Sequence, residues 1–209
     1  MVAFGARFRI AKAGIAAMVL FCLTPIVGFD ASVAYNDVAL AAACFMTFYA
    51  LQLWVVTEND LLLVLAGCAA GFAGSIKYTG FIAALFAFAF VLWKSRRHWA
   101  RLKPRLVLLV VPAALLIGPW LAKNAVEVGN PLAPFANRMF PNPNMHVSFE
   151  EGYRRSMAHF NNIELSEIPV EVTLKGGRIQ GLLGPVFLLA PIALFAIGSP
   201  VGRQLLLAF

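Results

Sequence analysis

The chain has 209 residues, of which 61% are hydrophobic, and it carries a formal net charge of +7 at pH 7. Soluble domains are about 45–50% apolar, whereas here the mean hydropathy is +0.79 and the apolar residues gather in long runs. This composition excludes an ordinary soluble domain and predicts one all-α membrane domain over residues 1–209. The basic residues are not interleaved with aromatic residues along a polar face, so the charge does not indicate a nucleic-acid partner.

The apolar runs predict about six transmembrane helices, because a helix of about 20 apolar residues crosses a bilayer. The first run follows a basic start without acidic residues at residues 1–12. A signal peptide ending near Ala34 is the alternative for this run, but the next run is itself long enough to be a span. The predicted spans are residues 13–29, 37–56, 61–76, 78–94, 106–123 and 181–198.

The long apolar stretch of residues 61–93 has a charged residue at its centre, Lys77. A lysine in the middle of a membrane would cost roughly 2.5–3.5 kcal/mol or more. Two short helices that meet at a bend near Lys77 avoid this cost, although each would be only about 24 Å long. Gly67 and Gly71 have the GxxxG spacing that allows close helix contact, and Gly74 extends the same face.

The distribution of basic residues predicts the topology. Residues 94–105 lie between two apolar runs and contain basic residues but no acidic residue, which is the signature of a cytoplasmic loop. If this loop is inside, the polar segment of residues 124–180 is outside. We therefore expect a multi-pass membrane protein with one large outside loop. The basic residues concerned are Lys94, Arg96, Arg97, Arg101, Lys103 and Arg105.

The chain leaves its fifth predicted span near Trp120, an aromatic residue that suits a membrane interface. Pro112 and Pro119 are expected to kink this span. Gly129, Asn130 and Pro131 then give a turn signal. Spacing alone indicates a membrane exit that is followed by a loop.

The predicted outside loop contains a candidate amphipathic helix. Ser148 and Glu151 have the spacing of a capping box, and the apolar residues that follow recur on one helical face. Such a helix either lies on the membrane surface or packs on the membrane domain, and the sequence leaves both open. The apolar positions are Phe149, Tyr153, Met157 and Phe160.

Two ionisable residues are candidates for chemistry. Asp37 opens the second span, where the helix dipole favours a carboxylate and Asn36 or Asp37 could cap the helix. Alternatively, Asp37 faces a cavity, where it holds a metal, positions an acceptor or acts as a base. Lys77 either meets a phosphate of a lipid-linked donor or extends to the lipid headgroups without a specific partner.

Several familiar motifs are absent from the sequence. It has no Gly-rich phosphate loop, no Gly-x-Ser-x-Gly, no His-Glu-x-x-His and no Cys-x-x-Cys. Their absence argues against a nucleotide-driven pump, a serine hydrolase and a zinc protease within this span of chain. His146 and His159 lie near Glu150 and Glu151, but no spacing among them fixes a metal site, so we assign no metal ligands.

Four segments, taken together in this order, resemble a known family. They are Tyr35-Asn36-Asp37, Gly74–Thr79, Gly118–Phe135 and Leu183–Pro191. Each segment is short, and the resemblance depends on their order and spacing over residues 30–195. The family is that of the bacterial polytopic membrane glycosyltransferases of the GT-C type, in glycosyltransferase family 39, which resemble protein O-mannosyltransferases and are related to lipid A aminoarabinose transferases.

The resemblance implies transfer of a hexosyl or pentosyl group from a polyprenyl-phosphate carrier to a glycan, lipid or protein acceptor on the periplasmic side. It implies that Asp37 is the acid of the second outside loop, with a catalytic role. It places Lys77 and Tyr78 beside the donor phosphate, and Lys123 and Asn124 among the substrate-binding residues. Basic residues or a divalent metal would stabilise the leaving phosphate.

One feature departs from the family pattern, because the first outside loop with the main catalytic acid is expected before residue 1. The last residues also look like the start of a further span. We therefore expect an internal or truncated piece of a longer enzyme that is inactive by itself.

Two rival functions stay open. An O-antigen ligase or polymerase would use basic residues of the large loop, such as Arg154, Arg155 and His159. A non-enzymatic transporter would place ionisable residues at mid-depth in several helices and often has an inverted repeat. The sequence shows only Lys77 at such a position and no repeat.

Overall fold

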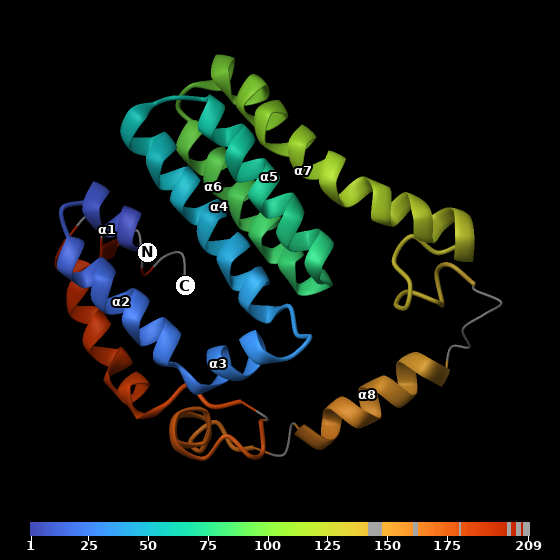
Figure 1. The fold of residues 1–209 in the computed structure, drawn as a ribbon. Helices are drawn as coiled ribbons and strands as arrows, with labels where there is room; N and C mark the ends of the chain where they lie inside the picture. Colours follow the sequence, from blue (N-terminus) through green and yellow to red (C-terminus); the bar gives the residue numbers. More distant parts are fainter. Residues whose placement is uncertain (142–147, 161–162, 180, 200–201, 204–205, 207–209) are drawn as a thin grey trace. The chain divides into compact units, whose positions relative to one another are not determined.

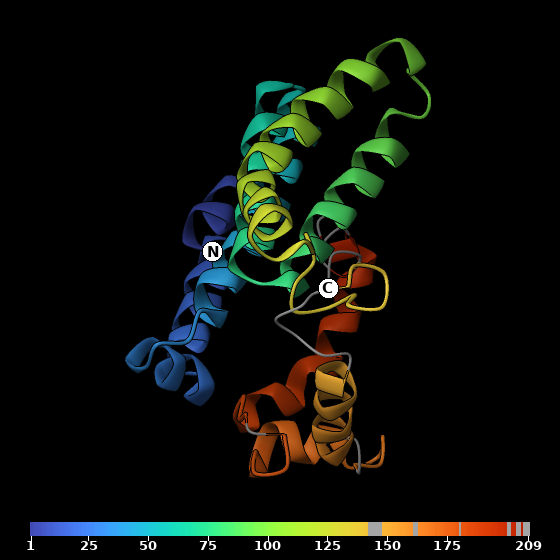
Figure 2. The same ribbon diagram turned by 90° about the vertical axis from the view of Figure 1, so that its right-hand side faces the viewer.

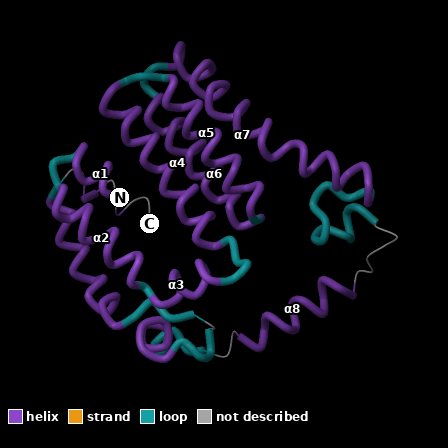
Figure 3. The backbone as a smooth tube through the Cα atoms, viewed as in Figure 1, coloured by secondary structure: helices purple, strands orange, loops and turns teal. Residues whose placement is uncertain are grey.

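A computed structural model describes residues 1–141, 148–160, 163–179, 181–199, 202–203 and 206. This part of the chain contains helices and connecting turns and no strand (Figure 3). It divides into two compact units, and each is described by itself. Unit 1 contains residues 1–38 and 156–209, and unit 2 contains residues 39–155. The prediction of an all-α protein is confirmed.

Unit 2 is built from four helices that lie side by side in Figure 1. They are α4 (Asp37–Thr57), which enters this unit at Ala39, α5 (Leu61–Ile76), α6 (Phe81–Ser95) and α7 (Trp99–Val128). All four contribute to one apolar core, which includes Leu51, Leu63, Val91 and Leu109. Large apolar side chains such as Leu85 and Leu115 are also exposed. An apolar surface of this kind fits a lipid environment.

Three helical segments are long and apolar enough to cross a membrane: α4, α7, and Tyr78–Ser95, which combines the short 3₁₀ helix η1 (Tyr78–Gly80) with α6. A bent pair of helices in unit 1 would make a fourth span if it crosses as one. Two further predicted spans correspond to apolar helices that are shorter, α5 and the 3₁₀ helix η3 (Pro185–Gly198). The count of six spans therefore stays a prediction.

Helices α5 and α7 approach each other through glycines. A Cβ atom added to Gly67 would overlap the carbonyl oxygen of Leu109, and one added to Gly71 would lie 2.7 Å from the Cα atom of Ala113. The close contact predicted from the GxxxG spacing is confirmed. The facing residues advance together along both helices, so α5 and α7 run in the same direction: Gly67 faces Leu109, Gly71 faces Ala113 and Gly74 faces Ile117.

The predicted bend near Lys77 is confirmed. Helix α5 ends at Ile76, and Lys77 is extended, with φ −156° and ψ 144°. The 3₁₀ turn η1 follows and leads directly into α6. Gly80 makes the bend tight, because a Cβ atom there would overlap the carbonyl oxygen of Ala73. Lys77 is thereby exposed between two helices instead of being held inside one.

Helix α7 is longer than the predicted span 106–123 at both ends. It begins at Trp99, and α6 ends at Ser95, so only residues 96–98 form a turn (Figure 2). The other residues of the basic segment 94–105, which was predicted as a loop, belong to these two helices. Lys and Arg are good helix formers, and their stems can reach water from a helical turn. The helix continues through Pro104, Pro112 and Pro119, and it stops where Gly129 adopts a left-handed conformation with φ +69°.

Unit 1 shows that the first predicted span is not one straight helix. Helix α2 (Ala11–Leu23) and helix α3 (Pro25–Ser32) are bent by 61° at Thr24. Pro25 explains the break, because a proline lacks the N–H group and disfavours helical geometry in the preceding residue. Accordingly, Thr24 is extended, with ψ 122°.

The rest of unit 1 consists of short elements, with α1 (Val2–Arg7) before α2. After residue 160 the chain forms α9 (Ile168–Val170), the π-helical turn η2 (Glu171–Lys175) and η3. A backbone bond from Ile26 to the carbonyl of Leu182, at 3.1 Å, joins the two parts of this unit. On its surface Arg178 donates to Glu167 at 2.8 Å, and this hydrogen bond lowers the pKa of the Glu167 carboxyl.

Gln52 of α4 is a buried polar side chain that gives a direct stability prediction. It is only 2% exposed, and both polar atoms of its amide lack hydrogen-bond partners among the described residues. Each unsatisfied buried group costs about 1–3 kcal/mol. Replacing Gln52 by leucine, which has a similar size, should therefore raise the apparent melting temperature in detergent by about 2–5 °C.

Gln52→Ala serves as the control for this experiment. It also removes the amide, but it leaves a cavity and should lower the melting temperature. A lower melting temperature for Gln52→Leu would contradict the prediction and would mean that the amide has a partner.

Candidate functional site

The candidate site lies at the end of unit 2 where α5 turns into α6 and α7 ends; we call it the Lys77 end. Lys77 is exposed on the bend. The Tyr78 hydroxyl donates a hydrogen bond to the carbonyl oxygen of Ala133 at 2.6 Å. The Tyr78 ring stacks on Phe81, with centroids 6.1 Å apart, and meets the edge of Phe135 at 5.7 Å. Tyr78 therefore fixes the loop after α7 onto the bend.

Two buried asparagines organise this loop, residues 129–141. Asn130 is fully buried, and its Nδ2 donates to the carbonyl of Phe135 at 2.7 Å and to Oδ1 of Asn137 at 3.2 Å. Its Oδ1 accepts from the backbone N–H of Leu132 at 2.9 Å. Asn137 is 2% exposed and donates from Nδ2 to the carbonyl of Pro134 at 2.7 Å. The loop is thus held by its own side chains, although it has no regular secondary structure.

The predicted amphipathic helix is present as α8 (Ser148–Phe160). Within unit 2 its first turns contact the loop, since Oε1 of Glu150 accepts from the backbone N–H and from Nδ2 of Asn137 at 2.7 and 3.0 Å. The Tyr153 ring also meets Phe135 edge-on at 5.9 Å. Phe149, Tyr153 and Met157 nevertheless stay exposed. The start of α8 is packed, and its apolar face remains available to lipid or to another protein surface.

The last turns of α7 carry the other predicted substrate-binding residues, which are helical and do not lie in a loop. Lys123 is exposed, with Nζ 5.6 Å from the Trp120 ring centroid and 3.9 Å from a carboxylate oxygen of Glu127. Asn124 is half-buried, and its Nδ2 is buried without a hydrogen-bond partner in the described part of the chain. An amide donor of this kind can bind an oxygen of a ligand.

An apolar pocket of about 390 Å³ reaches the Lys77 end between α5, α6 and α7. Its walls include Phe81 and Phe88 of α6 and Ile117 and Leu121 of α7. Phe81 also stacks on Tyr78, the residue directly after Lys77. The apolar pocket and the bend that carries Lys77 therefore share one wall.

Asp37 lies in the first turn of α4 and is half-buried, as expected for an acid at a helix N-terminus. It belongs to unit 1, whereas Lys77, Tyr78, Lys123 and Asn124 belong to unit 2. The structure therefore describes Asp37 separately from the other four residues, and the catalytic role of Asp37 stays a prediction.

No group of three or more His, Cys, Asp or Glu side chains gathers among the residues that the structure describes. Glu150, one candidate from the sequence, already binds Asn137. His146 and the side chain of His159 lie outside the described residues. We assign no residue to a divalent metal.

Sequence reasoning did not find the two asparagines that shape the loop. The turn at Gly129–Pro131 was expected, but the burial of Asn130 depends on contacts with Phe135 and Asn137 that spacing does not reveal. An asparagine just after a helix-ending glycine was the only available signal, because asparagine side chains often bind nearby backbone groups in turns.

Comparison with known proteins identifies a family. No curated protein and no solved structure matches the chain. The family described as dolichyl-phosphate-mannose-protein mannosyltransferase matches residues 3–122, which is more than half of the chain. The matched part includes Asp37, Lys77, Tyr78 and every wall of the apolar pocket, and it ends just before Lys123. The chain therefore belongs to the dolichyl-phosphate-mannose-protein mannosyltransferase family, whose members are membrane glycosyltransferases of the GT-C kind.

Proposed function

We propose that the protein takes part in transfer of a hexosyl or pentosyl group from a polyprenyl-phosphate carrier to a glycan, lipid or protein acceptor. We place this reaction on the periplasmic side of a bacterial inner membrane, as the positive-inside rule predicts for the Lys77 end. One observation carries the proposal: the apolar pocket is joined to the Lys77 bend through the Phe81–Tyr78 stack. An isoprenoid chain needs an apolar pocket, and its phosphate needs a cation beside it.

In this proposal Lys77 binds the carrier phosphate, and Nδ2 of Asn124 offers a second donor. When the bond between the anomeric carbon and the phosphate oxygen breaks, its electron pair stays with the phosphate. A fixed cation at that position stabilises the developing charge. The acceptor oxygen forms the new bond to the anomeric carbon and loses its proton to a carboxylate, for which Asp37 is the candidate of this chain.

Family membership favours this function over the rival interpretations. The basic residues that an O-antigen ligase or polymerase would use include Arg154 and Arg155 of α8, which lie beyond the matched residues. Arg155 is 4.0 Å from Glu151, an ordinary i,i+4 pair on an exposed helix surface. No described contact of these residues points to a sugar donor.

The test is a binding titration with the detergent-solubilised full chain and a polyprenyl-phosphate sugar. Lys77→Ala should weaken binding about 10–100-fold, because a hydrogen bond to a charged group contributes about 1.5–3 kcal/mol. Lys77→Arg should retain most of the affinity. Lys103→Ala, which removes an exposed lysine from the opposite end of unit 2, is the matched control and should bind normally.

A second ligand separates the two parts of the proposed site. The polyprenol without phosphate should bind wild type and Lys77→Ala equally weakly, since it uses only the apolar pocket. Equal affinity of wild type and Lys77→Ala for the phosphorylated donor would overturn the role of Lys77. No binding of the donor to wild type would overturn the proposed donor class.

A further inference from the structure

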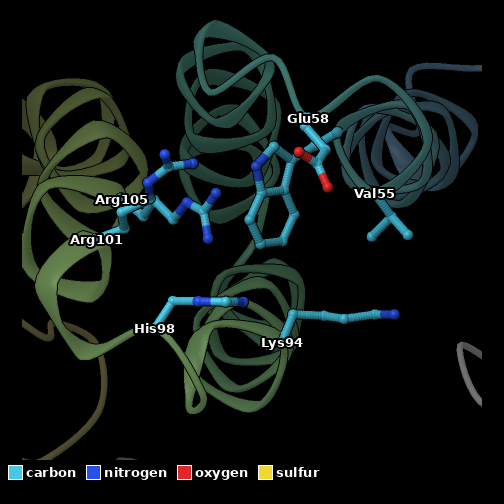
Figure 4. A pocket seen from close by; sticks show the side chains of 7 residues that line it. Val55, Glu58, Lys94, His98, Arg101 and Arg105 are labelled. Atoms are coloured by element: carbon cyan, nitrogen blue, oxygen red, sulfur yellow. The ribbon is translucent and has the colours of Figure 1, made fainter.

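A second pocket, of about 460 Å³, lies at the opposite end of unit 2, where α4 passes into α5 and α6 into α7. Its walls come from α4, α6 and α7 and from the turns that follow α4 and α6, and they include Trp54, Glu58 and Arg105. Figure 4 shows the side chains of Arg101 and Arg105 extending from α7, and that of His98 extending from the turn before it, toward the same space. Basic side chains outnumber the single acidic side chain of this pocket, Glu58.

Arg105, one of the residues that line this pocket, is fixed by an ion pair with Asp60. Nε of Arg105 lies 3.0 Å from Oδ1 of Asp60, and the Arg105 side chain is only 10% exposed. The same oxygen accepts a hydrogen bond from Nε1 of Trp54 at 2.8 Å. The guanidinium lies over the Trp54 ring, 5.2 Å from its centroid, and Nη1 donates to the hydroxyl of Ser95 at 3.4 Å. This cluster holds α4, α6 and α7 in place without using the other basic side chains.

The remaining basic side chains of the pocket form no ion pair with a described acid, although Glu58 lines the same pocket. The ion pairs of the described residues do not include Lys94, His98 or Arg101. Lys94 lies over the Trp93 ring, with Nζ 5.3 Å from its centroid. All three basic side chains are exposed, whereas Arg105 is buried. The pocket thus combines the buried, paired Arg105 with the exposed side chains of Lys94, His98 and Arg101, which come from two helices and the turn between them.

We propose that this pocket binds a phosphate group, with Arg101 as the main ligand and Lys94 and His98 as further donors. A guanidinium can bind a phosphate through two parallel hydrogen bonds, and an ammonium acts on it as a point charge. Exposed Trp93 and Trp99 flank this end of the helices, as expected where a membrane helix meets the headgroup region. The phosphate belongs either to an anionic lipid headgroup or to a soluble phosphate ester. This site lies at the other end of α5 and α6 from Lys77, so it is separate from the proposed donor site.

The test measures binding by tryptophan fluorescence of the detergent-solubilised full chain. The probes are short-chain phosphatidylglycerol, glycerol phosphate and, as the phosphate-free lipid, short-chain diacylglycerol. Wild type should bind a phosphate-bearing probe and should not respond to diacylglycerol. Arg101→Gln should weaken that binding about 10-fold, and adding Lys94→Gln should weaken it further.

Arg97→Gln is the matched control. Arg97 is an exposed arginine of the turn between α6 and α7, but it does not line the pocket. It should bind as wild type does. Response to phosphatidylglycerol alone assigns the site to a lipid headgroup, and response to both phosphate probes assigns it to phosphate esters in general. Equal losses in Arg97→Gln and Arg101→Gln would overturn the proposal in favour of diffuse surface charge, and no response to either phosphate probe would also overturn it. Since Arg101 is exposed, an unchanged melting temperature confirms that each variant is folded.

Discussion

Gly67→Ala is expected to lower the stability of the protein by about 3 kcal/mol, although it adds only one methyl group. The added Cβ atom would overlap the carbonyl oxygen of Leu109 on α7. A backbone carbonyl cannot rotate away as a side chain does, so α5 and α7 must separate. Overpacking a tight contact typically costs about 1–3 kcal/mol. The measurement is the apparent melting temperature in detergent, which should fall by about 6–12 °C.

Gly118→Ala is the matched control for this prediction. Gly118 lies on α7, and a Cβ atom there would meet no atom within 4 Å. Alanine is the better helix former by about 1 kcal/mol, so this variant should be at least as stable as wild type. Gly71→Ala should resemble Gly67→Ala, since its Cβ atom would lie 2.7 Å from Ala113. Equal destabilisation by Gly67→Ala and Gly118→Ala would show that helix separation is not the cause.

The helices of unit 2 were predictable where hydropathy and helix ends coincide. The apolar run of α4 ends at Thr57 and that of α5 begins at Leu61, and the polar residues between them make a turn. The bend at Lys77 was predictable for a different reason, namely the cost of a charge inside a long apolar run. Both predictions rest on solvation, which is a local property of the sequence.

Helix ends that hydropathy does not mark were not predictable in the same way. Hydropathy indicates where a chain prefers lipid, but the start of α7 at Trp99 and its end at Val128 lie in polar sequence. The break at Thr24 has the opposite origin, because Pro25 interrupts the helix inside a run that remains apolar. In both cases the helix ends where the backbone requires it, and this position differs from the end of the apolar run.

The candidate sites were only partly predictable. Lys77 and Asn124 could be named from their positions in the sequence, but the shared wall of Phe81 and Tyr78 could not. The pocket lined by Lys94, His98 and Arg101 was not predictable, because the sequence pattern indicates only a basic segment between two apolar runs. The same basic residues would fit either a surface loop or a binding pocket. Only the packing of α4 against α6 and α7 shows that they line a pocket.

Replacing Asn130 by alanine is expected to release the loop of residues 129–141 from the Lys77 end. The change leaves three groups without their partner: the carbonyl of Phe135, Oδ1 of Asn137 and the N–H of Leu132. Each unsatisfied buried group costs about 1–3 kcal/mol. The other hydrogen bonds of the loop, from Tyr78 and to Glu150, do not supply partners for these three groups. Hydrogen exchange of this loop should become at least about 100-fold faster, since a loss of about 3 kcal/mol allows that change. The global melting temperature should fall less, because the apolar core does not contact Asn130.

Asn59→Ala is the matched control for Asn130→Ala. Asn59 is exposed in the turn between α4 and α5, where its Oδ1 accepts from the N–H of Leu61 at 3.1 Å. Its removal should leave exchange in the 129–141 loop unchanged. Tyr78→Phe keeps the ring contacts but removes the bond to Ala133, so it should accelerate exchange by a smaller factor. Unchanged exchange in Asn130→Ala would contradict the prediction and would mean that the aromatic contacts of Phe135 with Tyr78 and Tyr153 are sufficient to hold the loop.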